Sequence, residues 1–349
     1  MNEVAAGVAF VRGIGGGYKE DLHRTAPLEW NREKDGHVVD LKRTIGTMLK
    51  VIFLFVLVYF CIAYLVPKWE ALELTGYIRK LPIGWIVVAG ALLFLHYIYI
   101  FALWVLLLRL LGSRRPEFFP VLRAYALSLL PKYIPGKVVA HGVKAQLALQ
   151  AGLPGATVSS SLIWEAALVL GSAALVGMLG FLGPDSASMQ EAARWLILVF
   201  AFGAGAFVVV GSTRMFGSRW KEWVGFPQMS KRPMAVIALF ALYVVSWLSY
   251  GLSHWFLANA VVPTHLSDLL PLSVALAVSW GLGFISLIAP AGLGVREGVL
   301  YLFILGWMTE GQALLFVTLS RILSFAVELL ITVLWWILHL ANRGPRKDA

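Results

Sequence analysis

The chain has 349 residues, of which 59% are hydrophobic and only 14% are charged. A typical soluble domain carries about 25% charged residues, and the mean hydropathy of this chain is +0.79. This composition excludes a soluble enzyme and indicates an integral membrane protein. We assign the net charge of +10 to basic cytoplasmic loops that face anionic lipid headgroups, and not to nucleic-acid binding. The single cysteine, Cys61, excludes an intramolecular disulfide and a cysteine-rich metal site.

The first 44 residues form a separate polar region in which seven basic residues balance seven acidic ones. No apolar run of signal-peptide length follows a basic start, so residues 1–44 are expected to be a flexible cytoplasmic tail. The transmembrane domain is expected over residues 45–342, and a short cytoplasmic tail over residues 343–349.

Six apolar stretches are long enough to cross a bilayer, which takes about 20 residues in a helix. They are Ile45–Val66, Leu81–Leu108, Ala156–Leu182, Trp195–Val210, Pro233–Val262 and Ala313–Leu340. Basic groups follow the second, fourth and sixth stretches, which places both termini in the cytoplasm by the positive-inside rule. The basic loop that contains Arg79 and Lys80 is the exception, since it would then lie outside.

Two further apolar stretches are interrupted by helix-breaking residues. They are Phe118–Gly152, broken by Pro131, Pro135 and Gly136, and Leu269–Met308, broken by Pro290, Gly292 and Gly294. Non-helical backbone at membrane depth requires surrounding protein or a water-filled cavity. We therefore predict two re-entrant helical hairpins around a site. With the six full spans they make eight hydrophobic segments, in an all-α polytopic membrane protein.

The two interrupted stretches also align with each other at an offset of 156 residues. The aligned pairs include Gly136 with Gly292, Gly142 with Gly298, His141 with Glu297, and Glu165 with Arg321. With six spans, one hairpin enters from the cytoplasm and the other from outside. The two halves, about 81–183 and 233–340, would then form an inverted repeat. Transporters use such repeats with interrupted helices to place a binding site near the midplane of the bilayer.

Two motifs at these breaks carry a family resemblance. The segment PAGLGVREG at residues 290–298 resembles the PGGLGVREG-type signature of the lysylphosphatidylglycerol synthase transmembrane-region family. The segment PKYIPGK at residues 131–137 resembles that family's KYIPG motif, although the chain continues with Val138-Val139 where glycines are frequent. The resemblance, which includes Arg321 in the last span, implies the lipid-translocating membrane part. The lysyl-transfer domain is expected to be absent, because nine residues follow Leu340.

The residues around the second break suit an anionic headgroup. Charges inside a membrane are costly and mark substrate paths. Arg296 offers a planar fork for two phosphate oxygens, and Gly292 and Gly294 let backbone N–H groups point at a phosphate beside a helix N-terminus. Glu297 would neutralise Arg296 in the empty site or bind a cationic headgroup. The alternative is a purely structural pair of Arg296 and Glu297.

The remaining candidates for substrate binding are Arg123, Lys137, His141, Lys144, Glu165 and Arg321. Glu165 and Arg321 occupy matching repeat positions, so a pair across the two-fold axis is one interpretation and lipid contact is another. Arg321 and Glu328 lie two turns apart on one helix face. The three candidates between residues 137 and 144 are spaced for one helix face, which would either line the site or lie at the membrane interface.

We predict that the chain translocates or handles an anionic lipid in a bacterial inner membrane. A phospholipid, an aminoacylated phospholipid and a polyprenyl-phosphate-linked lipid all fit. The sequence contains no metal-ligand spacing among its histidines and no nucleophile motif, so no cofactor, metal or catalytic residue is assigned. His96 and His254 lie inside spans and are expected to be packing residues.

Two other functions stay open. One is an intramembrane lipid-modifying transferase with Glu165, His141 or Glu297 as the base. The other is a scaffold for envelope lipid or glycan enzymes. The expected partners are membrane lipids and an envelope-biosynthesis enzyme. No nucleotide-binding motif is visible, so transport would be passive, gradient-coupled or partner-driven.

Overall fold

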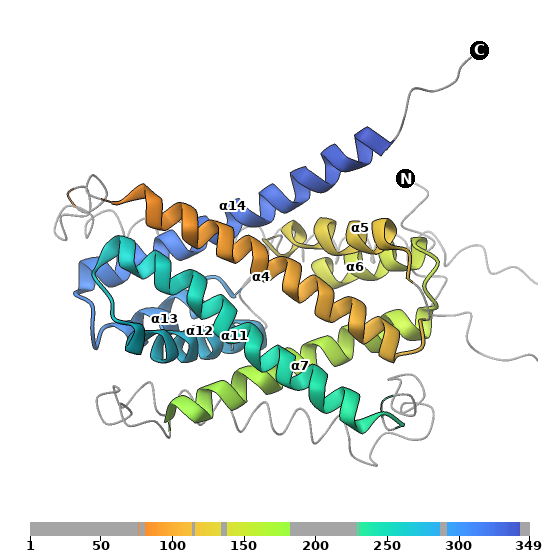
Figure 1. The fold of residues 1–349 in the computed structure, drawn as a ribbon, viewed down its shortest axis with the longest axis horizontal. Helices are drawn as coiled ribbons and strands as arrows, with labels where there is room; N and C mark the ends of the chain where they lie inside the picture. The colour runs from red at the N-terminus through yellow and green to blue at the C-terminus, as the bar shows by residue number, and fades with distance from the viewer. Residues whose placement is uncertain are drawn as a thin grey trace, which may run out of the picture. The chain divides into compact units, whose positions relative to one another are not determined.

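A computed structural model describes residues 81–113, 116–133, 138–181, 231–286 and 292–342, together with Gly76 and Met229. Within these ranges every regular element is a helix (Figure 1). Several predictions lie outside the described residues: both tails, the spans Ile45–Val66 and Trp195–Val210, and the residues Pro135, Gly136, Lys137 and Pro290.

Four long helices form the frame of the described part. They are α4 (Ile83–Leu110), α7 (Gly155–Phe181), α11 (Pro233–Val261) and α14 (Glu310–Asn342). Each is long and apolar enough to cross a membrane. These helices confirm four of the six predicted full spans, with bounds close to those expected from hydropathy.

The first interrupted stretch is broken where the prolines predicted. It contains α5 (Phe118–Ser128), the 3₁₀ turn η1 (Leu130–Tyr133) and α6 (Val138–Gln150). Proline has no N–H and its ring clashes with the preceding turn. The α-helical ladder therefore stops at Ser128, before Pro131.

The second interrupted stretch is also broken, but its first arm is longer than a re-entrant hairpin needs. The turn η3 (Leu266–Asp268) leads into α12 (Leu269–Ile285), and α13 (Val295–Ile304) follows the break. The described residues from Leu266 to Ile285 are long and apolar enough to span a membrane by themselves. The only proline of α12 is Pro271 in its first turn, where it leaves the helical ladder intact.

The element order of the first half recurs in the second half: a long helix, an interrupted pair and a second long helix. α4 packs on α11, α5 packs on α14, and α12 packs on α7. Hydrogen bonds join His96 to Ser249 and Tyr99 to the carbonyl of Leu242, so α4 and α11 run antiparallel. Figure 1 shows α5 and α6 beside one end of the long helices, and α12 and α13 beside the other end.

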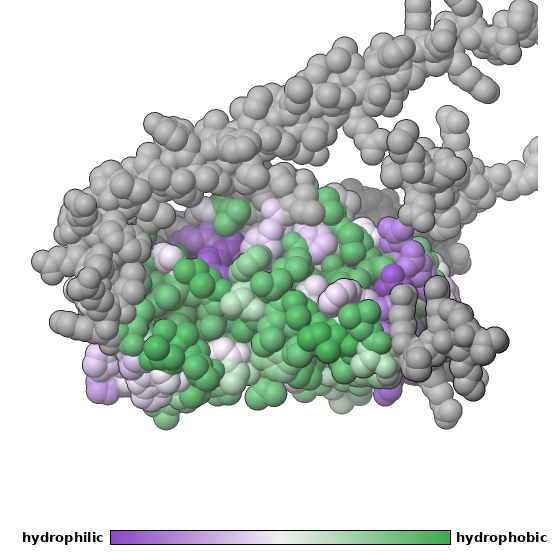
Figure 2. Space-filling model, turned by 90° about the horizontal axis from the view of Figure 1, so that it is seen from above, coloured by the Kyte–Doolittle hydropathy of each residue, from purple (hydrophilic) through white to green (hydrophobic). Residues whose placement is uncertain are grey.

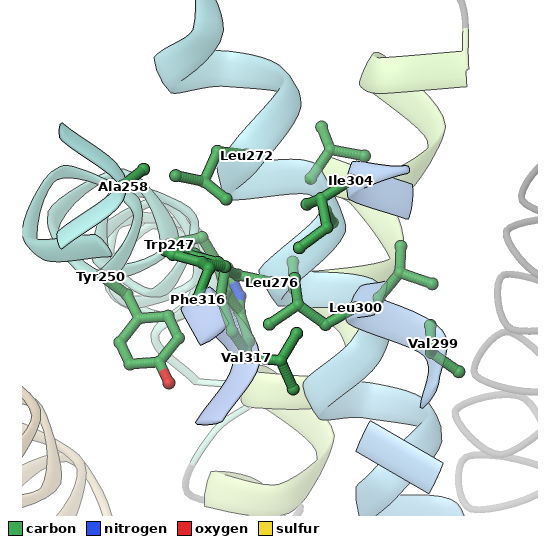
Figure 3. Close-up of a cluster of buried hydrophobic side chains, with 14 of the residues drawn as sticks. Trp247, Tyr250, Ala258, Leu272, Leu276, Val299, Leu300, Ile304, Phe316 and Val317 are labelled. Atoms are coloured by element: carbon green, nitrogen blue, oxygen red, sulfur yellow. The ribbon is translucent and has the colours of Figure 1, made fainter. Parts of the chain in front are cut away.

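A buried apolar core joins the second half to α4 and α7. It contains Trp247, Leu272, Leu276 and Phe316, and Tyr250 lies at its edge (Figure 3). A second core lies among α4, α5, α7 and α11, around the fully buried Trp104 and Tyr243. Both cores are made by side chains of one face of each long helix, which leaves the opposite faces for the surroundings.

The outward faces of the long helices are apolar as well. Large exposed apolar side chains include Ile83, Ile237, Ile322 and Trp336. Figure 2 shows a broad apolar surface with hydrophilic residues toward its two ends. A soluble monomer rarely exposes an apolar surface of this extent, whereas the hydrocarbon core of a bilayer requires it. The chain is therefore a multi-pass membrane protein.

Candidate functional site: charges at the helix breaks

The second break is built by two glycines in the left-handed region. Gly292 has φ of 70° and Gly294 has φ of 84°, a conformation that other residues adopt only with strain. A Cβ atom on Gly292 would lie 2.8 Å from the Cα atom of Gly283 in α12, so the chain passes α12 at close range. This contact fixes the start of α13 against the end of α12. Gly283 was not among the predicted site residues.

Glu297 closes the start of α13 and holds α14. One of its carboxylate oxygens accepts the backbone N–H of Gly294 at 2.7 Å, and the other forms an ion pair with Nε of Arg321. The Gly294 N–H is therefore engaged within the protein, and the expectation that it points at a phosphate is wrong. The expected ion pair of Arg296 with Glu297 does not form, because neighbouring residues on a helix point in different directions, and Glu297 acts on the charge of Arg296 only at longer range.

Arg296 is buried, with 8% of its surface exposed, and contacts a neutral partner. Its Nη2 atom donates a hydrogen bond to the hydroxyl of Tyr250 in α11. Its guanidinium carbon lies 5.7 Å from the centre of the Tyr250 ring. Within the described ranges no carboxylate lies at ion-pair distance from Arg296. Among the described residues, this guanidinium is thus a buried positive charge whose contacting partner is a neutral hydroxyl.

Glu328 lies at the middle of α14 and is completely buried. It forms an ion pair with Lys132 of η1 and accepts a hydrogen bond from the hydroxyl of Tyr97 in α4. Lys132, Tyr97 and Tyr250 were not predicted as site residues. A carboxylate in the middle of a span must have a buried partner, and that requirement was the available signal for a cation elsewhere in the chain.

These contacts form what we name the central charge cluster, which consists of Lys132, Arg296, Glu297, Arg321 and Glu328. The positive charge of Lys132 interacts electrostatically with both Arg296 and Arg321, which links the three cations in one group. They come from the break of the first half, from the start of α13 and from α14. Three cations against two carboxylates leave the cluster with one net positive charge.

A third ion pair among the described residues joins α6 to α7 in the first half. Nζ of Lys144 in α6 lies 2.8 Å and 2.6 Å from the two carboxylate oxygens of Glu165 in α7. The same nitrogen lies 4.0 Å from the centre of the Trp104 ring. The expected pair of Glu165 and Arg321 is therefore wrong, since each has a partner on the short helix of its own half.

Two of the remaining candidates, Arg123 and His141, lie at exposed positions. Arg123 is exposed on α5, and His141 is exposed on α6 with its ring 6.1 Å from the ring of Phe284 in α12. Lys144 is buried, so the side chains of α6 do not share one environment as their spacing suggested. Lys137 lies outside the described residues.

The buried His254 and the half-buried His96 serve packing and hydrogen bonding, as predicted. Nδ1 of His254 lies 2.9 Å from the carbonyl of Tyr250, and Nε2 lies 3.0 Å from Oγ of Ser320. A carbonyl only accepts, so Nδ1 carries the proton of a neutral ring. His96 binds Ser249. In the described part of the chain no group of three histidine, cysteine or acidic residues is placed to hold a metal ion.

The fold and these contacts define a polytopic helical membrane protein with a buried charge cluster at its helix breaks. The sequence model of the lysylphosphatidylglycerol synthase TM region matches residues 47–332, and the chain belongs to this family. The resemblance seen in the two motifs is thereby confirmed. No curated protein matches the chain significantly.

Proposed function

We propose that this protein translocates an anionic lipid across the membrane, with the headgroup passing through the central charge cluster. The observation that carries the proposal is the buried Arg296, whose contacting partner is the neutral hydroxyl of Tyr250. A lone charge in a span costs about 2.5–3.5 kcal/mol on insertion scales. Binding of an anion to Arg296 during the transport cycle would offset this cost.

The chemistry of the cluster fits a phosphate group. Arginine binds two phosphate oxygens at once through its planar fork, and Lys132 and Arg321 supply further cations next to Arg296. The outward faces of the long helices are apolar, which suits acyl or polyprenyl chains that stay in the bilayer while the headgroup crosses. Membership of a lipid-related membrane family supports the same class of substrate.

The arrangement of the halves supports alternating access. Equivalent helices α4 and α11 run antiparallel, and the interrupted pairs lie at opposite ends of the long helices (Figure 1). We interpret the halves as an inverted repeat whose interrupted pairs bring their breaks to the interior of the membrane. Transporters with this architecture place the substrate where the breaks of the two halves meet. Here Lys132 from the first break and Arg296 from the second lie in one cluster.

We favour translocation over the transferase alternative. A general base needs a carboxylate or imidazole that can take a proton from the substrate. Glu165 is held between two short contacts to Lys144, and Glu297 is held by Gly294 and Arg321. The proposal includes a bacterial inner-membrane location with both termini in the cytoplasm, because the basic flanks of the spans predict it.

The proposal is tested in proteoliposomes with fluorescent phosphatidylglycerol, by measuring the fraction that dithionite bleaches over time. We expect wild-type protein to move the label between leaflets, Arg296→Ala to abolish movement, and Arg296→Lys to slow it at least about tenfold, because lysine keeps the charge and loses two charge-assisted hydrogen bonds. The matched control is Arg232→Ala, at the exposed start of α11.

Two results would contradict the proposal. One is a folded Arg296→Ala variant that moves the label at the wild-type rate. The other is wild-type protein that moves zwitterionic phosphatidylcholine as fast as phosphatidylglycerol. If Arg296→Ala does not fold, Arg296→Lys becomes the deciding variant.

A further inference from the structure

We propose that the central charge cluster takes up one proton with each anionic headgroup that it binds, and that Glu328 carries this proton. The inference rests on the proposed function, since it requires that an anionic lipid binds at the cluster. It adds an energy source, because a site that binds an anion together with a proton can be driven by a proton gradient.

The surroundings of Glu328 are closed to solvent, and one cation is in direct contact with its carboxylate. Its side chain is fully buried, and its direct contacts are Nζ of Lys132 and the hydroxyl of Tyr97. The titratable and charged groups that face this site from the surrounding elements are Tyr97 of α4, Tyr125 of α5, Lys132 and Tyr133 of η1, Tyr250 of α11, Arg296 of α13 and Arg321 of α14. Lys132 is the cation of this group in ion-pair contact with Glu328.

Lys132 therefore has two competing anions. It neutralises Glu328 in the empty protein, and it also interacts electrostatically with Arg296 and Arg321, the cations that we propose bind the phosphate. Its side chain is 31% exposed whereas that of Glu328 is 0% exposed, so Lys132 is the partner that can move. A phosphate oxygen that takes Nζ of Lys132 leaves the Glu328 carboxylate buried without its cation. A buried carboxylate in that position is neutralised by binding a proton.

The charges balance in this exchange. A phosphodiester headgroup brings one negative charge, and one proton from water bonds to a carboxylate oxygen of Glu328. Lys132 keeps its three protons and its charge throughout, since its new partner is a phosphodiester anion. The cluster has one net positive charge before binding and the same net charge afterwards. In a bacterial inner membrane the inward proton gradient would then carry the lipid from the outer to the inner leaflet.

The test measures protons directly on the wild-type protein. Full-length protein in maltoside micelles is titrated with short-chain phosphatidylglycerol by calorimetry, in buffers of different ionisation enthalpy at one pH, with short-chain phosphatidylcholine as the reference for partitioning. We expect about one proton taken up per lipid bound. Uptake of a proton means that binding is favoured at low pH, so affinity should fall about tenfold for each pH unit of increase where uptake is complete.

Glu328→Gln identifies the proton carrier. Glutamine is neutral at every pH, so this variant should bind the lipid without proton uptake and with an affinity that does not change with pH. The matched control is Glu310→Gln, which removes an exposed carboxylate at the start of the same helix and should keep the uptake of the wild type. Infrared difference spectra of the wild type should show the C=O band of a protonated carboxylic acid on lipid binding.

Each outcome decides between the inference and the proposed function. Lipid binding without proton uptake and without pH dependence would overturn the inference and leave the proposed function standing. Proton uptake that persists in Glu328→Gln would overturn the role of Glu328. No binding of the anionic lipid would overturn the proposed function and this inference with it. If Glu328→Gln does not fold, absence of the carboxylic acid band in the wild type would still overturn the inference.

Discussion

Each half of the protein places a charge of its short helix against the long helix that follows, but the two halves use opposite signs. In the first half α6 supplies the cation Lys144 and α7 the carboxylate Glu165. In the second half α13 supplies the carboxylate Glu297 and α14 the cation Arg321. Glu165 and Arg321 are aligned in the repeat. The aligned positions on α7 and α14 thus both form an ion pair with the short helix of their half, with opposite signs, although their partners Lys144 and Glu297 are not aligned with each other.

The two pairs also differ in what surrounds them. The side chains of Lys144 and Glu165 are 8% and 16% exposed, and an aromatic ring covers the ammonium group. The side chains of Arg321 and Glu297 are 15% and 23% exposed, and Arg321 interacts electrostatically with Lys132 of the central charge cluster. We infer that the first pair joins α6 to α7 as a structural element, while the second pair sets the charge of the binding site.

The largest loss of stability should come from removing one partner of the first pair, Lys144 and Glu165. Lys144→Met leaves Glu165 as an unpaired carboxylate beside an aromatic ring, and breaking a buried ion pair in this way costs about 3–5 kcal/mol. We expect a large drop in the thermal unfolding temperature, measured in detergent by the loss of the monodisperse peak after heating. The double variant Lys144→Met with Glu165→Leu should recover most of that loss, because no charge is left unpaired.

The transport rate of the double variant tests the structural assignment of this pair. We expect it to move phosphatidylglycerol at close to the wild-type rate. A double variant that is stable but inactive would place Lys144 and Glu165 on the path of the lipid, and the distinction between the two pairs would be lost.

A smaller effect on stability should follow from breaking the second pair. Glu297→Gln keeps an oxygen that can accept the N–H of Gly294 but loses the ion pair with Arg321. Hydrogen bonds to charged groups contribute about 1.5–3 kcal/mol, and the partial exposure of this pair places the expected loss at the lower end. The same variant raises the net charge of the cluster by one, so phosphatidylglycerol should bind more tightly. The measurement is calorimetric titration with the short-chain lipid.

Lys144→Met provides the contrast for lipid affinity. It should change stability much more than Glu297→Gln does and leave lipid affinity nearly unchanged. Unchanged or weaker lipid binding in Glu297→Gln would show that the second pair is as structural as the first.

The spans and breaks were predictable because their signals are local. Hydropathy over about 20 residues marks a spanning helix, and α4, α7, α11 and α14 follow it closely. Proline and glycine predict the ends of helices such as α5 and α12, because proline lacks an N–H and glycine readily adopts backbone angles outside the helical region. The stretch Leu269–Met308 was predicted to break at Pro290, Gly292 and Gly294, and α12 continues to Ile285 through Gly281 and Gly283, because glycine inside a helix weakens it without ending it.

The partners within the site were less predictable because they depend on contacts distant in sequence. Lys132 and Glu328 are 196 residues apart, and no sequence pattern links them. Aligning Glu165 with Arg321 identified equivalent positions, but equivalent residues touch only close to a two-fold axis. The contact of Glu297 with Gly294 could have been expected, since an acid at the third helical position commonly accepts the N–H of the capping residue.

The smallest effect on stability should come from substituting two aligned glycines of the short helices, at which a side chain would face open space. Gly142 lies in α6 and Gly298 lies in α13, and no described atom lies within 4 Å of a Cβ added at either position. Glycine inside a helix is less favourable than alanine by about 0.5–1 kcal/mol. Gly142→Ala and Gly298→Ala should therefore each raise the unfolding temperature slightly, and lipid transport should not change.

The pair of substitutions compares the two halves at the same position. We expect Gly142→Ala and Gly298→Ala to raise the unfolding temperature by the same small amount. Each glycine weakens its short helix, and the ion pair of that helix with the following long helix compensates for the weakness. A loss of transport in Gly298→Ala alone, with stability intact, would mean that the headgroup or its chains approach α13 more closely than α6. The two halves would then differ in their contact with the lipid as well as in the polarity of their ion pairs. The path of the lipid would lie on the side of Arg296.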